Sequence, residues 1–167
     1  MRLVEQSVAK DDPDPKALAC YGLLVSWTGI DGQPREEVWL RFVDGRPISS
    51  VTTAFLEWGC TKLEGLGQKV WVLPWDNASW HLSKEVRSWI RGHNRQVKRE
   101  GKGVRTIVCQ LPIKSPWLNP IEPHWVHGKR KVVEPDRLLT ARELAERVCE
   151  HFKCPHEVHL TIPEKVS

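Results

Sequence analysis

Two short segments of the chain contain residues that could carry out metal-dependent chemistry. Asp76 directly follows an apolar run and begins the segment Asp76-Asn77-Ala78-Ser79-Trp80-His81, and Glu122 follows a proline-punctuated stretch. Functional side chains in open α/β sheets gather at the carboxyl ends of strands, so both acids should converge if the strands before them are neighbours. Carboxylate oxygens suit Mg²⁺, and two such ions about 3.5–4 Å apart can activate a nucleophile and stabilise a leaving oxygen on phosphorus. The two acids are therefore candidates for phosphoryl transfer.

Both acids also have a structural interpretation. With Asn119 as N-cap and Pro120 at the first helical position, Glu122 falls where a carboxylate closes a capping box. Asp76 could likewise cap the next helix or face its dipole. Asn77 and His81 could position a phosphate or a ligand water, or they could anchor the loop. The residues alone leave these alternatives open.

The elements that must position these residues follow from periodicity and turn residues. They predict an α/β order of strand, strand, helix, strand, helix, strand, helix, helix. The predicted strands are 17–28, 36–43, 69–75 and 105–111, and the predicted helices are 49–63, 82–98, one that starts near Pro120, and 140–152. The first two strands should form a hairpin, and the last two should be buried on both faces. We expect Ser49 or Ser50 to cap the helix 49–63, and Leu144, Val148 and Phe152 to point inward.

Composition restricts the class of protein. The 167 residues suit one domain, and no apolar stretch approaches the length of a membrane span or of a secretory signal. Five cysteines without framework spacing favour a reducing cytoplasm. Residues 1–76 carry 8 basic and 11 acidic groups, whereas residues 77–167 carry 17 and 10. This asymmetry predicts an anionic partner, nucleic acid first, for the second half.

The helix 82–98 combines an apolar stripe with a basic face. The basic face most often is only a solvated surface, but its charge makes non-specific, salt-sensitive phosphate contact plausible. The candidate DNA-binding residues are Lys84, Arg87, Arg91, Arg95 and Lys98.

A family resemblance sharpens these hypotheses. The Asp-Asn-Ala-Ser-x-His segment and the segment Ser115-Pro-x-Leu-Asn-Pro-Ile-Glu-x-x-Trp125 resemble the second and third acidic motifs of DDE transposases of the mariner-like insertion-sequence family. The resemblance implies an RNase H-like mixed sheet flanked by helices, with Asp76 and Glu122 as metal ligands and Asn119 in support. It also implies two Mg²⁺ or Mn²⁺ ions, transposon-end and target DNA as partners, and a basic run at Lys129, Arg130 and Lys131. The implied host compartment is the prokaryotic cytoplasm, at the nucleoid.

The sequence departs from the family pattern at its start. The family has a first Asp on a strand upstream of the hairpin, preceded by a helix-turn-helix region. Before Ala17 the chain offers Asp11, Asp12 and Asp14 in a proline-broken loop. We therefore expect a loop over 1–16, a partial catalytic domain over 17–133 that lacks its first strand, and a C-terminal helix and tail over 134–167.

Three functions follow from that expectation. The first is a transposase catalytic-domain fragment, nearly inactive alone, whose intact relative cleaves DNA and transfers strands. The second is a non-catalytic remnant that binds DNA, forms a homo-oligomer or pairs with full-length transposase through an open sheet edge. The third is a nuclease of the same fold without strand transfer.

Cysteines and histidines cluster near the C-terminus, between Cys149 and His159. Their spacing matches no common closed zinc site, so an ordinary helix is the favoured interpretation. The other cysteines, Cys20, Cys60 and Cys109, lie in apolar runs and are expected in the core.

Overall fold

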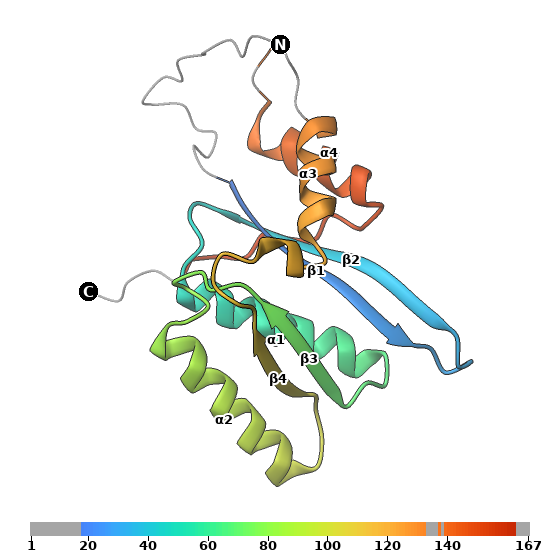
Figure 1. Ribbon diagram of the computed structural model, residues 1–167, viewed down its shortest axis with the longest axis vertical. Helices are drawn as coiled ribbons and strands as arrows, with labels where there is room; N and C mark the ends of the chain where they lie inside the picture. Colours follow the sequence, from blue (N-terminus) through green and yellow to red (C-terminus); the bar gives the residue numbers. More distant parts are fainter. Residues whose placement is uncertain (1–17, 133–136, 138, 163–167) are drawn as a thin grey trace.

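The computed structural model describes residues 18–132, 137 and 139–162 and has a mixed α/β fold (Figure 1). The element order agrees with the predicted one, with an added 3₁₀ turn before the third helix. The elements are β1 (Leu18–Thr28), β2 (Pro34–Asp44), α1 (Ser49–Gly65), β3 (Val70–Trp75), α2 (Lys84–Glu100), β4 (Arg105–Gln110), η1 (Pro116–Leu118), α3 (Glu122–Val132) and α4 (Ala141–Phe152).

The strands β1 and β2 form the predicted antiparallel hairpin, in register from Leu18 opposite Asp44 to Thr28 opposite Pro34. Gly29 closes the turn by donating its N–H to the carbonyl of Gln33 at 2.8 Å, and Gly32 takes a positive φ of 75° that suits glycine. Inward side chains such as Val25 and Trp39 are almost fully buried. The hairpin therefore contributes one wall of the core.

The strands β3 and β4 are parallel neighbours, as the site hypothesis required. The prediction that both are buried on two faces is wrong, because burial alternates along β3 and most of β4 is exposed or half-buried. Trp71 and Leu73 face the core, whereas Val72 on the other face is 56 % exposed. The helices α1 and α2 cover only one face of this pair, and that asymmetry explains the alternation.

The helix α1 joins the two strand pairs. Its Leu56 and Leu63 belong to the same buried cluster as Trp39 of β2 and Trp71 of β3. A Cβ at Gly59 would lie 2.8 Å from the Trp71 ring, so glycine permits this close approach. The predicted serine cap is wrong: Ile48 precedes the helix, and no side chain caps it.

The helix α4 packs on the hairpin, where Ala145 and Cys149 form a cluster with Leu40 and Phe42 of β2. Thr140 caps it, and the capping box with Glu143 is complete. Val148 and Phe152 pack against this cluster as predicted, and Leu144 is half-buried, but the fully buried residues of the helix are Ala141, Ala145 and Cys149. Small side chains let the helix approach the strands closely, and Val148 and Phe152 pack at the margin.

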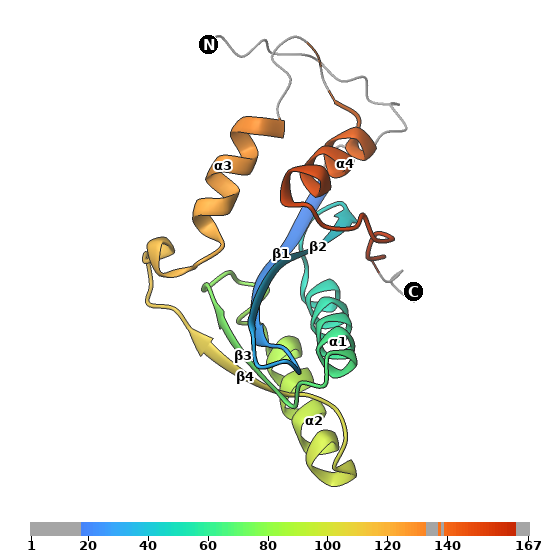
Figure 2. The same cartoon turned by 90° about the vertical axis from the view of Figure 1, so that its right-hand side faces the viewer.

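The two strand pairs remain separate two-stranded sheets in the described part of the chain. The strands β1 and β3 run in opposite directions, and each has one edge without a strand partner among these residues (Figure 2). No helix in the described ranges is long and apolar enough to cross a membrane.

Candidate active site

Asp76 lies immediately after β3 and is fixed on one side by its own loop. Its Oδ1 accepts the backbone N–H of Ala78 at 3.0 Å and lies 2.8 Å from Nδ1 of His81. The His81 ring stacks on Trp75 with 4.5 Å between ring centroids and 5° between planes. These contacts orient the carboxylate and leave Oδ2 without a hydrogen-bond partner among the described residues. The Asp76 side chain is 54 % exposed, so it is open to a ligand.

Glu122 is the first residue of α3 and follows the loop after β4. Its backbone N–H donates to the carbonyl of Asn119 at 3.0 Å. The predicted capping box would place Glu122 at the third helical position, but the helix begins at Glu122, so that alternative is wrong. Within the described ranges no hydrogen bond or ion pair occupies its carboxylate, which therefore remains available.

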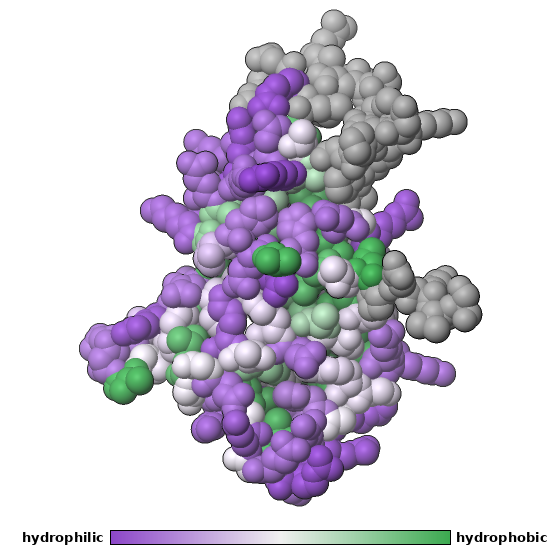
Figure 3. Space-filling model, turned by 180° about the vertical axis from the view of Figure 1, so that it is seen from behind, coloured by the Kyte–Doolittle hydropathy of each residue, from purple (hydrophilic) through white to green (hydrophobic). Residues whose placement is uncertain are grey.

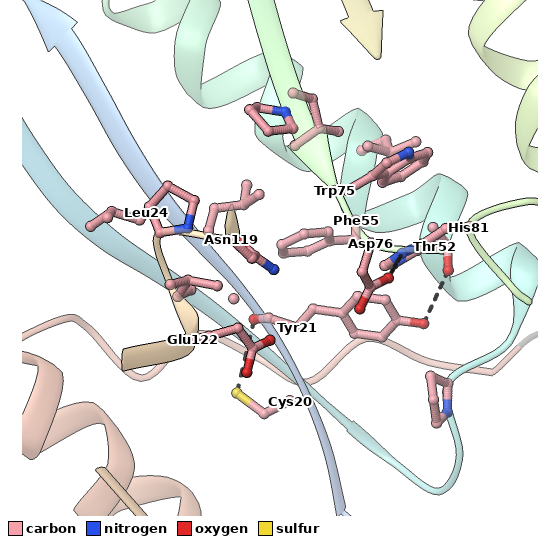
Figure 4. Close-up of a pocket in the computed structure, with 18 of the residues that line it drawn as sticks. Cys20, Tyr21, Leu24, Thr52, Phe55, Trp75, Asp76, His81, Asn119 and Glu122 are labelled. Carbon is pink, nitrogen blue, oxygen red and sulfur yellow. Dashed lines mark hydrogen bonds and ion pairs between the residues drawn. The ribbon is translucent and has the colours of Figure 1, made fainter. Parts of the chain in front are cut away.

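Both acids line one pocket with a volume of 280 Å³. Figure 4 shows the carboxylates of Asp76 and Glu122 entering it from two different elements, with Tyr21 of β1 between them. The pocket lies between the facing edges of β1 and β3, and Phe55 of α1 lies on its inner side. The strand neighbours thus bring together the two acids that the sequence singled out.

The loops that hold the acids are tied to each other. Asn77 donates its side-chain N–H to the carbonyl of Leu111 at 2.6 Å, and Leu111 donates its backbone N–H to the carbonyl of Trp75 at 3.0 Å. The loop after β3 is therefore anchored to the loop after β4. Of the two roles left open for Asn77, the geometry shows loop anchoring, whereas Asn119 and His81 line the pocket itself.

Two side chains of the pocket wall, those of Tyr21 and Cys20, are neutral. Burial raises the pKa of the Tyr21 phenol, whose hydroxyl lies 3.1 Å from Oγ1 of Thr52. Burial also raises the pKa of the Cys20 thiol, so it stays protonated. A divalent cation at the acids would meet no competing charge from these two side chains.

A family comparison agrees with this geometry. The model of the DDE superfamily endonuclease family matches residues 35–145, which is more than half of the chain. The chain belongs to the DDE superfamily endonucleases. No curated protein matches it. The family fits the mixed α/β, RNase H-like arrangement, and it implies nuclease chemistry on DNA with divalent metal.

The basic residues predicted for this endonuclease lie on two helices. Lys84, Arg87, Arg91, Arg95 and Lys98 are all exposed on α2, and Lys129, Arg130 and Lys131 are exposed on the last turns of α3. In Figure 3 the end of the molecule formed by the last turns of α2 is largely hydrophilic. The sequence identified this face correctly as solvent-exposed.

Part of the candidate pocket was not predicted from the sequence. Tyr21, Trp75 and Trp80 all line it, yet none of them was assigned to the site. The signal for Trp75 was its position directly before Asp76, at a strand end. Tyr21 gave no such signal, because its place depends on how the hairpin meets β3.

The prediction that Cys20, Cys60 and Cys109 lie in the core is confirmed only in part. Cys60 is buried as expected, and Cys20 is half-buried, but Cys109 is exposed on the uncovered face of the β3–β4 pair. No group of three or more potential metal ligands is preassembled among the described residues, at the segment from Cys149 to His159 or elsewhere.

Proposed function

We propose that Asp76 and Glu122 are two of the metal ligands of a DNA-cleaving site in a transposase of the mariner-like insertion-sequence type. The observation that carries this proposal is their shared pocket: one acid ends β3, the other begins the helix after β4, and both carboxylates enter the same hollow. The alternative first ligands Asp11, Asp12 and Asp14 lie outside the described residues.

The two carboxylates fit Mg²⁺ or Mn²⁺. Mg²⁺ in proteins commonly takes one or two carboxylates and keeps several waters or phosphate oxygens, and the open sides of Asp76 and Glu122 leave room for those ligands. When bound, such ions would supply Lewis-acid stabilisation of charge on the phosphoryl oxygens and an activated water.

The chain's own residues orient the site. His81 holds Oδ1 of Asp76, and the Trp75 stack keeps the His81 ring in place, so the carboxylate keeps Oδ2 turned to the pocket. Asn77 fixes the distance between the two acid-bearing loops through Leu111. Such positioning lowers the entropic cost of reaching the transition state, because the reacting groups are already held in the required geometry.

The basic helices would hold the DNA backbone. Lys84 and Arg87 lie in the first turn of α2, close in sequence to the Asp76 loop, and the run from Lys129 to Lys131 ends the helix that Glu122 begins. Phosphate contacts of this kind position a duplex without reading its sequence. Strand transfer to target DNA and assembly as a homo-oligomer belong to the same proposal.

A second candidate function, pairing with full-length transposase or another copy, rests on a different observation. The facing edges of β1 and β3 line the pocket, and Nε1 of Trp75 is buried there without a partner among the described residues. Unpaired strand edges accept an added strand, whose carbonyls could also satisfy that indole N–H. The expected function is then association without cleavage.

One experiment separates these functions. Mn²⁺ binding to the purified chain is followed by electron paramagnetic resonance, and nicking of supercoiled DNA and sedimentation are measured on the same preparation. We expect weak Mn²⁺ binding that Asp76→Asn and Glu122→Gln each reduce at least tenfold, and nearly absent nicking. Glu85→Gln, an exposed acid of α2 outside the pocket, is the matched control.

Each outcome has a defined meaning. Mn²⁺ binding that survives both substitutions, with unfolding midpoints unchanged, rejects the two acids as ligands. Robust Mg²⁺- or Mn²⁺-dependent nicking that Asp76→Asn abolishes shows that the chain alone is active and overturns the expected inactivity. Association that depends on protein concentration, without metal binding, supports the second candidate.

A further inference from the structure

The segment after α4, residues 153–162, lies along the end of the hairpin and is called the C-terminal strap below. Leu160 of the strap donates its N–H to the carbonyl of Phe42 at 2.7 Å, and Arg41 donates to the carbonyl of Val158 at 2.8 Å. Glu157 accepts hydrogen bonds from Trp58 Nε1 at 2.9 Å and from Lys62 Nζ at 3.2 Å. These contacts give the strap a defined position on β2 and α1.

Two histidines of the strap face each other beside the last residue of β2. Nε2 of His156 lies 3.1 Å from Nε2 of His159, and Nδ1 of His159 lies 2.8 Å from Oδ1 of Asp44. Both rings contact Phe42, with 5.6 Å between centroids in each case. The aromatic contact and the carboxylate together fix the His159 ring.

The Asp44 contact decides which nitrogen of His159 carries the proton. The carboxylate of Asp44 accepts a hydrogen bond from a protonated Nδ1, and in the neutral imidazole Nε2 then presents its lone pair. That lone pair points at Nε2 of His156, whose own Nδ1 has no hydrogen-bond partner among the described residues. If His156 also carries its proton on Nδ1, two nitrogen lone pairs meet at one point.

The distance between these two nitrogens matches the distance between two ligand atoms that bind the same metal ion. Two imidazole nitrogens bound at about 2.0–2.1 Å and subtending an angle between 90° and the tetrahedral value lie about 2.9–3.4 Å apart. The arrangement of carboxylate, imidazole and metal is also the one in which an outer carboxylate orients a ligating histidine. We propose that His156 and His159 form a binding site for a divalent transition metal such as Zn²⁺, with Asp44 as the residue that orients His159.

The site has two protein ligands and open positions. It borders a hollow of 440 Å³ that Glu146 of α4 also lines, and Glu146 is already engaged by Nε of Arg142 at 2.9 Å. No third ligand is preassembled in the described part of the chain, so water completes the coordination. Imidazole ligands select Zn²⁺, Cu²⁺ or Ni²⁺ over Mg²⁺, so the site differs in chemistry from the two acids of the pocket.

Bound metal would fasten the strap to the hairpin. His156 and His159 both belong to the strap, so the ion acts on the hairpin through the hydrogen bond between His159 and Asp44, the last residue of β2. A ligand that binds only the folded chain raises its stability by mass action. The site is independent of the DNA-cleaving proposal, because none of its residues lines the acid pocket.

The test is titration of the tag-free chain with Zn²⁺, followed by calorimetry, and with Co²⁺, followed by its visible absorption. We expect one ion per chain, a loss of at least tenfold in affinity for His156→Ala and for His159→Ala, and a loss of about tenfold for Asp44→Asn. His151→Ala, at an exposed histidine near the end of α4, and Cys154→Ser should leave affinity unchanged. Asp76→Asn should also leave it unchanged.

Two results would overturn the proposal. One is Zn²⁺ affinity that is the same in the double variant His156→Ala/His159→Ala as in the parent chain, with both chains folded by circular dichroism. The other is a loss caused by Cys154→Ser but not by His156→Ala, which would assign the ion to the thiols. The metal-dependent rise in unfolding temperature gives an independent reading: it should disappear in the two histidine variants, become smaller in Asp44→Asn, and stay unchanged in the control variants.

Discussion

The two strand pairs differ in length, in how fully they are covered and in the loops to which they lead. The β1–β2 hairpin has strands of eleven residues, is covered by α1 and α4, and supplies Phe42 and Val43 to the most deeply buried positions. The β3–β4 pair has strands of six residues, leaves one face uncovered, and leads into both acid-bearing loops. The hairpin thus supplies the most deeply buried strand residues, whereas the parallel pair, whose Trp71 and Leu73 also enter the core, leads to the two candidate acids.

The same comparison explains where the pocket lies. Within a single continuous sheet the edges of β1 and β3 would be covered, but here each pair ends at an edge that faces the other. The helix α1 bridges them in the core, through residues such as Leu56 and Leu63. The pocket therefore forms at the junction, with acids from one side and Tyr21 from the other.

The largest expected effect is on stability, and it should fall on the hairpin side. Trp39 of β2 is 3 % exposed and contacts Trp58 of α1 with 6.0 Å between ring centroids. Trp39→Ala should lower the free energy of unfolding by about 3–5 kcal/mol, because it opens a cavity that the core fills only in part. Val72→Ala, on the uncovered face of β3, should cost less than about 1 kcal/mol. Urea unfolding of both variants measures the two losses in free energy of unfolding. Equal losses would contradict the expected difference between the hairpin and the uncovered face of β3.

Local sequence signals predicted the elements well because their causes are local. Ser83 caps α2 by accepting the N–H of Val86, and Gly101 ends it with a φ of 66°. Thr140 and Glu143 form a capping box three residues apart. Each of these depends on neighbours along the chain, so position in the sequence was enough. The start of α1 at Ser49 was predicted correctly, but its serine cap was not. Ile48 precedes the helix, and its carbonyl accepts the hydroxyl of Thr52, which also contacts Tyr21 of another element.

The two acids of the candidate site could be predicted from the sequence, whereas the residues that form the walls of its pocket could not. Asp76 and Glu122 follow strand ends and lie in motif-like segments, so sequence located both. The burial of β3 and β4 was overestimated because an apolar run does not reveal that its second face lacks a cover. The approach of His159 to Asp44 joins residues 115 positions apart, and only the fold brings them together.

An intermediate effect is expected on DNA binding, and it should fall on the β3–β4 side. The charged ends of Arg87, Arg91 and Arg95 are exposed on α2. Replacing all three with Gln should flatten the plot of log affinity for duplex DNA against log salt by up to about 2.7 in slope, since each phosphate contact contributes about 0.9. Unfolding should change little, in contrast to Trp39→Ala. An unchanged slope in a fluorescence anisotropy titration would remove α2 from the DNA interface.

The smallest effect concerns the cap of α4, on the hairpin side, and it depends on pH. Arg137 donates to both carboxylate oxygens of Glu143, at 3.0 and 2.8 Å, and with the Thr140 N–H it lowers the pKa of Glu143 from its ordinary value of 4.5 to about 2. A carboxyl whose pKa is lower in the folded state stabilises that state above the unfolded pKa, and the contribution disappears as pH falls through the folded value. Glu143→Gln should therefore lower the urea midpoint modestly at pH 7, and the difference from the parent chain should shrink steadily below pH 4.5. DNA affinity should not change, because α4 lies apart from the acid pocket. A difference in midpoint that stays constant down to about pH 2.5 would contradict this prediction. The negative charge of Glu143 would then not be what stabilises the cap, because protonated Glu143 would stabilise it as well as the carboxylate does.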